Sequence, residues 1–185
     1  MDNACCFFTL VFLESSVAFM RVEVVSVLRE LAPKFLAEVA DALAGLLRHL
    51  GDEAGAGWNE RIGPWFRNHW PHRKEQRTAE VSRALAEVAI EAGEGFGDAV
   101  EVLQSHLVAF EESTVAENRL KEVSHVCRFP AATLTLFNAI VPDAPKLWVW
   151  SGLDTLLDDV AVAGGNLSDD PRFRCFQNIA ARAGL

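Results

Sequence analysis

Tyrosine is absent from this chain of 185 residues, and no stretch of it carries a convincing β-hairpin signal. β-strands favour aromatic and β-branched residues in alternation, and hairpins need short turns rich in glycine and asparagine. A strand-rich fold is therefore a weak alternative. A disordered chain is also disfavoured, because 50% of the residues are hydrophobic and only 23% are charged.

The sequence also lacks the motifs that would identify a particular enzymatic reaction. The glycine-rich stretch at 93–97 has neither a following lysine with serine or threonine nor a preceding strand, so we interpret it as a helix break rather than a phosphate loop. No Ser-His-Asp signature and no metal-ligand cluster stand out. We predict that the chain is not an enzyme and uses no cofactor and no metal. A small hydrolase based on Cys127 or His125 is a minor alternative, because no base can be placed beside the thiol.

Cysteine is scarce, and the four cysteines do not form a recognisable framework. They make no CxxC motif and no zinc-finger spacing, and a disulfide between adjacent Cys5 and Cys6 would be strained. Reduced thiols are typical of cytosolic proteins. We therefore predict a cytoplasmic protein with free thiols, at Cys5, Cys6, Cys127 and Cys175.

Long apolar runs are missing as well. The run at 4–13 (ACCFFTLVFL) has ten residues, too few to span a bilayer, and no basic region precedes it. Three interpretations stay open: a buried first helix or strand, a non-native leader with Met20 as the true start, or a cryptic signal sequence. We therefore separate an atypical apolar segment at 1–20 from a single α-helical domain at 21–185, and expect no membrane insertion.

What the chain does have is helical periodicity. Apolar residues recur at helical spacing from residue 22 onwards, and Pro33 restarts the pattern. Residues 51–57 (GDEAGAG) look like the clearest loop, whereas Thr78, Asp98 and Asp170 can cap helices. No exact repeat period is visible. Consecutive helices joined by short turns predict an all-α fold, with antiparallel helical hairpins packed as a bundle or a short HEAT-like solenoid. We expect helices to begin near residues 22, 33, 58, 78, 98, 114, 130, 151 and 170.

The stretch WFRNHWPHRKEQR, residues 65–77, combines an aromatic stripe with cations. Trp65, Phe66 and Trp70 form an apolar face if the segment is helical, and we expect this face to be a structural aromatic core. Pro71 should end the helix. His69 and His72 have HxxH spacing but no complete ligand set nearby in the sequence, so we do not expect metal there.

Positive charge is concentrated in the same region. The chain has a net charge of −9, yet 61–77 holds five cations and a single acid. A purely structural interpretation is that these cations favour the carboxyl-terminal end of a helix. The functional interpretation is contact with a phosphate, a nucleic acid or an acidic partner, through Arg67, Arg73, Lys74 and Arg77.

Several short motifs carry a resemblance to a known group. They are Trp65, the pair Trp70–Pro71, the pattern F-x-x-AV at 96–100, VPDxP at 141–145 and DPRF at 170–173. Residues 57–185 resemble the carboxyl-terminal helical region of large bacterial proteins linked to antiphage defence, which often carry a sirtuin-like or P-loop domain upstream. The resemblance implies a helical scaffold detached from its effector. No catalytic residue carries over, because the chemistry of those proteins would lie outside this region.

These observations predict a non-enzymatic helical scaffold, sensor or protein-interaction module, and the resemblance implies an association with defence. Apolar helix faces left without neighbours should bind a protein partner or self-associate. The alternative is a nucleic-acid-binding helical domain that uses the basic strip at 61–77.

Overall fold

The computed structural model describes residues 30–110, 119–142, 153–164 and 166–183. This part of the chain is all-α and has no strand, which confirms the predicted fold class. Its α-helices are α3 (Pro33–Leu50), α4 (Ala54–Gly57), α5 (Gly63–His69), α6 (Ala79–Glu91), α7 (Phe96–Leu103), α9 (His125–Arg128), α10 (Pro130–Ile140), α11 (Leu153–Ala163) and α12 (Pro171–Ala183). Tighter or wider turns connect them: η1 (Gly51–Glu53), the π-helical η2 (Trp58–Ile62), η3 (Lys74–Gln76), η4 (Gly93–Gly95), η5 (Gln104–His106) and η7 (Leu167–Asp169).

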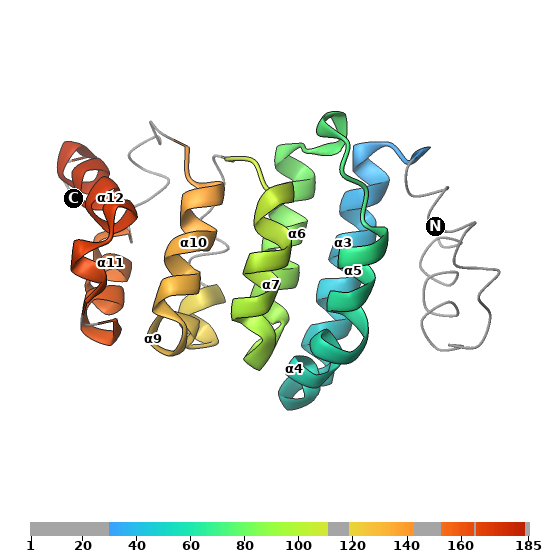
Figure 1. The fold of residues 1–185 in the computed structure, drawn as a ribbon, viewed down its shortest axis with the longest axis horizontal. Helices are drawn as coiled ribbons and strands as arrows, with labels where there is room; N and C mark the ends of the chain where they lie inside the picture. The colour runs from blue at the N-terminus through green and yellow to red at the C-terminus, as the bar shows by residue number, and fades with distance from the viewer. Residues whose placement is uncertain (1–29, 111–118, 143–152, 165, 184–185) are drawn as a thin grey trace.

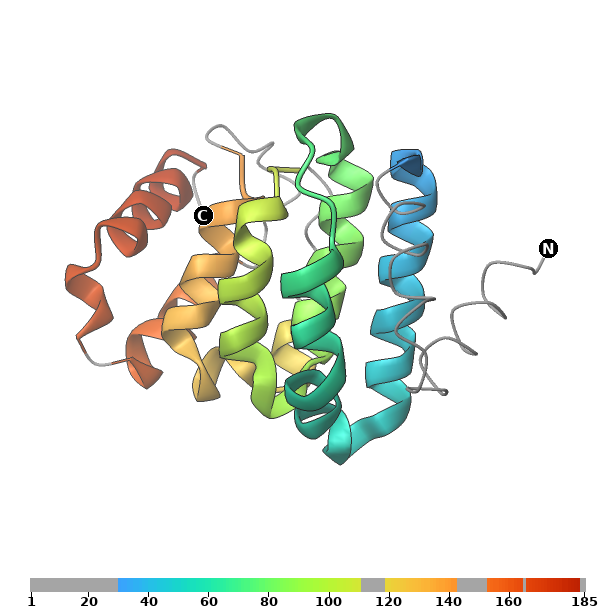
Figure 2. The ribbon, with the colours of Figure 1, turned by 45° about the vertical axis from the view of Figure 1, so that its right-hand side comes forward.

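The helices stand side by side in a row of hairpins (Figure 1). The row begins with α3 and α5, continues through α6 with α7 and α9 with α10, and ends with α11 and α12 (Figures 1 and 2). Successive long helices run in opposite directions from α3 to α7, as short connections require. None of the helices in the described part of the chain is long and apolar enough to cross a membrane.

Several helix boundaries follow from local chemistry that the sequence shows. The hydroxyl of Thr78 accepts a bond from the amide of Val81 at 3.3 Å and caps α6, as expected. Helix α5 ends at His69, and Trp70 is extended with ψ of 134°, because a residue before proline avoids the helical region. The carboxylate of Asp170 accepts a bond from the Arg172 amide at 2.8 Å at the start of α12.

Three local expectations are wrong. Residues 51–57 are not a loop, because η1 and α4 continue the chain as helical turns. Asp98 does not cap α7, which begins two residues earlier at Phe96. The helix expected from residue 114 to 129 is broken in its described part, since Ser124 adopts a left-handed conformation with φ of 59° before α9. Four expectations lie outside the described residues: the segment 1–20, the helix at 22–31 except for its last two positions, and the caps at Thr114 and Ser151.

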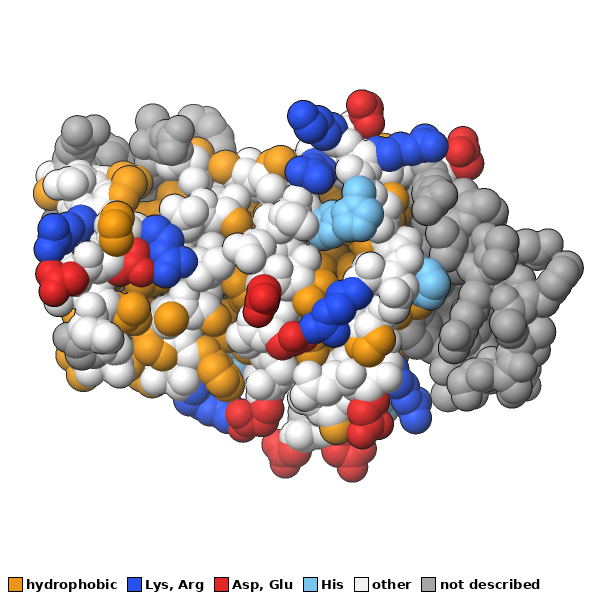
Figure 3. All heavy atoms as spheres, in the orientation of Figure 1, with side chains coloured by type: hydrophobic (Ala, Val, Ile, Leu, Met, Phe, Trp, Pro, Cys, Tyr) orange, Lys and Arg blue, Asp and Glu red, His pale blue; other side chains and the backbone are white. Residues whose placement is uncertain are grey.

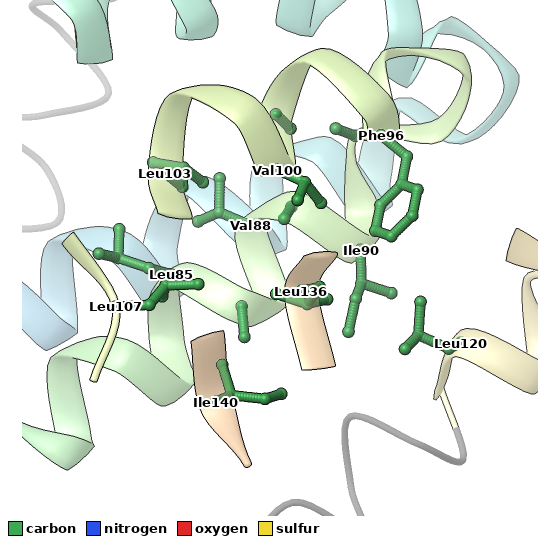
Figure 4. Packing of buried hydrophobic residues seen from close by; sticks show 14 of the residues in the cluster. Leu85, Val88, Ile90, Phe96, Val100, Leu103, Leu107, Leu120, Leu136 and Ile140 are labelled. Carbon is green, nitrogen blue, oxygen red and sulfur yellow. The ribbon is translucent and has the colours of Figure 1, made fainter. Parts of the chain in front are cut away.

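The core runs along the row, with α6 at its centre. Helix α3 packs its inner face against α6, and α7 covers the next side of α6. Figure 4 shows apolar side chains of α6, α7 and α10 converging on one another. Burial of each such side chain contributes on the order of 1.5–3 kcal/mol. The largest fully buried side chains are Trp58, Phe66, Phe96, Phe137, Leu36, Leu47, Ile62, Leu85, Ile90 and Leu103.

Candidate functional site

The region where α5 meets α7 is built around one buried indole. Trp58 is 0% exposed, and two glycines lie against its ring. A Cβ at Gly63 would lie 3.0 Å from Trp58 Nε1, and a Cβ at Gly95 would lie 2.6 Å from Trp58 Cδ1. Asp98 Oδ2 accepts a hydrogen bond from Trp58 Nε1 at 2.7 Å. A side chain at either position would crowd the ring, so Gly95, within the glycine-rich stretch at 93–97, makes room for the indole.

The other oxygen of Asp98 pairs with Arg67, one of the cations expected to contact phosphate. The guanidinium Nη2 donates to Asp98 Oδ1, and both side chains are partly exposed. Arg67 therefore joins α5 to α7 across the Trp58 pocket. The sequence analysis did not identify Trp58 and Asp98 as partners. The available signal was the pair of glycines, Gly63 and Gly95, that follow Trp58 in the chain.

The aromatic stripe is buried to different depths. Phe66 is 1% exposed and Trp70 is 3% exposed, whereas Trp65 is half-buried against the edge of the core. The Phe66 and Trp70 ring centroids lie 4.9 Å apart, and Trp65 meets Phe66 edge-on at 5.2 Å. Such aromatic pairs add about 0.5–1.5 kcal/mol beyond the burial of their area. His69 lies against Trp65, with ring centroids 6.4 Å apart.

The remaining cations of the strip cluster at the corner between α5 and α6. Figure 3 shows Lys and Arg side chains at the upper edge of the molecule over this corner, with acidic side chains beside them and His side chains below them. Arg73 Nη2 lies 3.6 Å from Glu30 Oε1, and both side chains are exposed. Lys74 is exposed, while Arg77 is half-buried with its Nε inaccessible to solvent. The four candidate contacts are thus not equivalent, since Arg67 and Arg73 already face acids.

Two histidines that are distant in the sequence, His72 and His106, are in contact at the same corner. The rings of His72 and His106 lie 4.7 Å apart with an angle of 34° between their planes. His106 is 4% exposed, and its burial, together with the nearby His72 and Arg77, lowers its pKa from 6.5 to about 4. His106 is therefore neutral at physiological pH. Its contact with His72 depends on how α7 docks, which no local motif encodes.

A second polar cluster links α3, α6 and the segment before α9. The Glu91 side chain is 5% exposed and accepts bonds from Arg48 Nε at 3.0 Å and Arg119 Nε at 2.7 Å. Burial alone would raise the Glu91 pKa, but the bonds from Arg119 and Arg48 outweigh it and lower the pKa below its usual 4.5. The cluster therefore ties α3 and the segment before α9 to α6.

Within the described residues, no hydrogen bond joins His125 to the thiol of Cys127. His125 Nε2 bonds to the carbonyl oxygen of Ile90 at 2.8 Å, and its ring stacks on Phe96 with centroids 4.5 Å apart. Burial lowers the His125 pKa. Cys127 is exposed, as is Cys175. Among the described residues, no group of three or more His, Cys, Asp or Glu could hold a metal ion.

Comparison with known proteins finds a relative of unknown function. The uncharacterized protein y4cA of Sinorhizobium fredii (strain NBRC 101917 / NGR234) is 30% identical over 131 residues, which is 70% of this chain. The chain spans only 11% of the length of that protein. No family model matches the chain, and no solved structure matches it.

Proposed function

We propose that this chain is a non-enzymatic helical module that binds other proteins through an exposed apolar stripe on α3. The inner face of α3 is filled by residues buried against α6, including Leu36, Ala40 and Leu43. Along one edge of this buried face, Phe35 is 49% exposed and Leu46 is 40% exposed. These two positions are 11 residues apart, three helical turns, so they line one apolar stripe. This stripe is the observation that carries the proposal.

The expected occupant of the stripe is another helix with an apolar face. Each helix in the row buries one side against its neighbour, and rows of helical hairpins grow by adding further helices at their ends. Helix α3 is the end helix of the described row, so an added helix would pack against Phe35 and Leu46 as α6 packs against the inner side (Figure 1). The relative is far longer than this chain, which is in keeping with a region that works beside other parts.

Self-association tests this proposal directly, because a second copy supplies an apolar helix. We expect the parent protein to gain mass with concentration in size-exclusion chromatography with light scattering. The double variant Phe35→Glu/Leu46→Glu should stay monomeric at every concentration, because charge on the stripe opposes burial. The matched control is Val162→Glu, which places a charge on another exposed apolar side chain, 87% exposed in α11. A parent that is monomeric throughout and binds no apolar dye would count against the proposal.

The role in antiphage defence rests on the sequence motifs at 65–71, 96–100, 141–145 and 170–173, and we propose it as the setting of this module. The exposed free thiols of Cys127 and Cys175 support a reducing, cytoplasmic setting. The neighbouring genes provide the check. An adjacent reading frame for a sirtuin-like, nuclease or P-loop domain is expected, and its consistent absence would argue against this setting.

Nucleic-acid binding is the second candidate, supported by the exposed cations at the α5–α6 corner. Two of the four expected contacts are weakened by their acidic partners, Asp98 for Arg67 and Glu30 for Arg73. Titration of labelled DNA and RNA at two salt concentrations distinguishes this function. Binding that weakens with salt and is lost in Arg73→Glu/Lys74→Glu would favour it over the protein-binding module.

A further inference from the structure

We propose that the corner between η3 and η5 is a binding site for a phosphate group, formed by His72, Arg77 and His106. The site is independent of the apolar stripe on α3 and goes beyond the proposed function. His72 lies just before η3, Arg77 directly follows η3, and His106 is the last residue of η5. The 4.7 Å ring contact between His72 and His106 joins the two turns, although 34 positions separate the residues in the chain.

Two buried polar atoms in this corner have no hydrogen-bond partner. They are Nε of Arg77 and Nδ1 of His106, and each is essentially inaccessible to solvent. A buried polar group without a partner costs on the order of 1–3 kcal/mol, and more when it is charged. Proteins rarely keep two such atoms in one place unless something else satisfies them.

The charges around the corner identify what that partner would be. The charged groups that act on His106 are His72 and Arg77, both basic. Within the described residues, Arg77 makes no ion pair, in contrast to Arg48, Arg67, Arg73 and Arg119. No carboxylate of the described residues is among the charged groups that act on His106, and a basic group of this kind suits an oxyanion. Phosphate matches it best, because it offers several acceptor oxygens to a guanidinium and two imidazoles.

The two turns are held in place by bonds outside the proposed site. Gln76 Nε2 donates to the Leu31 carbonyl at 2.9 Å and ties η3 to the start of α3. The Val108 amide donates to Ser82 Oγ at 2.9 Å and ties the segment after His106 to α6. Because both turns are anchored, the donors are largely preorganised, which lowers the entropic cost of binding.

Binding needs no change of protonation and only a small movement. Neutral His106 can carry its proton on Nδ1 and donate from it, while the Arg77 guanidinium is always charged. His72 is exposed and lies against the His106 ring, so a rotation of the His72 side chain admits an anion that His72 can then contact. Exposed side chains change rotamer within nanoseconds, so this rotation is not a barrier to binding.

The test is a titration of the full chain with inorganic phosphate, compared with chloride at equal ionic strength. Nuclear magnetic resonance of the histidine rings should show saturable shifts at His72 and His106. The exposed His49 on α3 serves as the internal reference and should not shift. Thermal melting should move upward with phosphate but not with chloride.

Variants decide whether the corner itself is responsible. Arg77→Gln and His72→Ala should each weaken phosphate binding at least tenfold, whereas Arg61→Gln, which removes an exposed cation in η2, should not change it. His72 is exposed, so His72→Ala tests the site even if Arg77→Gln impairs folding. Shifts that do not saturate, or that persist in both variants, would overturn the proposal.

A parallel titration with a short single-stranded oligonucleotide separates the two sources of a phosphate group. If the shifts occur with either ligand and are lost in His72→Ala, the site is supported, and the tighter ligand identifies the source. If neither ligand shifts His72 or His106, the site does not exist. Neither result depends on the light-scattering behaviour of the α3 variants, so failure of one proposal leaves the other standing.

Discussion

The two ends of the row of helices are held together in different ways. From α3 to α7, partly buried polar bonds link residues far apart in sequence, such as Trp58 to Asp98 and Arg48 to Glu91. From α10 to α12, the paired charges are close neighbours in the chain, such as Asp170 with Arg172 and Asp169 with Arg174. The bond from Arg172 Nη1 to Thr135 Oγ1, at 2.7 Å, is a long-range polar link in that half. We infer that the first half resists local opening more strongly than the second.

Removing the central indole should produce the largest effect. Trp58→Ala empties a fully buried site between two glycines, and we expect a loss of about 3–5 kcal/mol in the free energy of unfolding. Chemical denaturation measures this loss. Trp65→Ala is the matched control, and it should cost clearly less, because Trp65 is only half-buried. Equal losses in the two variants would show that the glycine-lined pocket has no special role.

A substitution in the Glu91 cluster should produce the second largest loss in the free energy of unfolding. In Glu91→Gln the carboxylate that accepts bonds from Arg48 and Arg119 becomes a neutral amide, and we expect a loss of about 1–3 kcal/mol at neutral pH. The native pKa of Glu91 is lowered, so its contribution is complete above the usual value of 4.5 and is lost as pH falls through the native pKa.

Unfolding measured at a series of pH values checks that sign. The difference between the parent and Glu91→Gln should shrink as the solution is acidified below pH 4.5. Glu101→Gln, which changes an exposed carboxylate on α7, should match the parent throughout. A difference that stays constant across the acid range would mean that charge pairing at Glu91 contributes nothing.

A substitution at the start of α12 tests how the α10–α12 half of the row is stabilised. In Asp170→Ala the side chain that caps the helix and pairs with Arg172 is lost, and we expect a cost of about 0.5–2 kcal/mol. Bonds from Arg172 lower the Asp170 pKa from 3.8 to about 2, so the stabilisation is full above pH 3.8 and disappears as pH approaches 2.

Hydrogen exchange locates the effect of that change. Protection should fall in α12 and leave α6 unchanged if the two halves open separately. Asp169→Ala is the control, because its exposed pair with Arg174 contributes little. Loss of protection across the whole row would show instead that the two halves unfold as one unit.

The sequence predicts the helices well because their signals are local. Thr78 caps α6 and Pro71 follows the end of α5, and both residues act within a few positions of themselves. The glycines mislead because their role is not local. Gly57 lies against Leu50, with a Cβ position 2.6 Å from its Cδ1, so a glycine in 51–57 marks close packing between helical turns rather than a loop.

The candidate site is harder to predict for the same reason. His72 and Arg77 lie in the basic strip and are visible in the sequence, but His106 comes from η5, which follows α7. Asp98 likewise looks like a helix cap until η2 and α5 dock beside α7 and bring Trp58 and Arg67 to it. Spacing along one helix identifies neighbours on that helix. It does not identify partners that meet only after two helices pack.

The smallest effect on the free energy of unfolding is expected for exposed side chains at the corner between α5 and α6. Arg73→Ala/Lys74→Ala should change the free energy of unfolding by no more than about 0.5 kcal/mol, because both side chains are exposed and the pair of Arg73 with Glu30 is open to solvent. Trp70→Ala, only three positions before Arg73 but 3% exposed, should cost about 3–5 kcal/mol. Thermal melts of the two variants therefore divide the stretch 65–77 into a structural part and a surface part. If Trp70→Ala melted like the parent, the ring would not be part of the core, and the stretch would have to be reinterpreted as a platform for ligands.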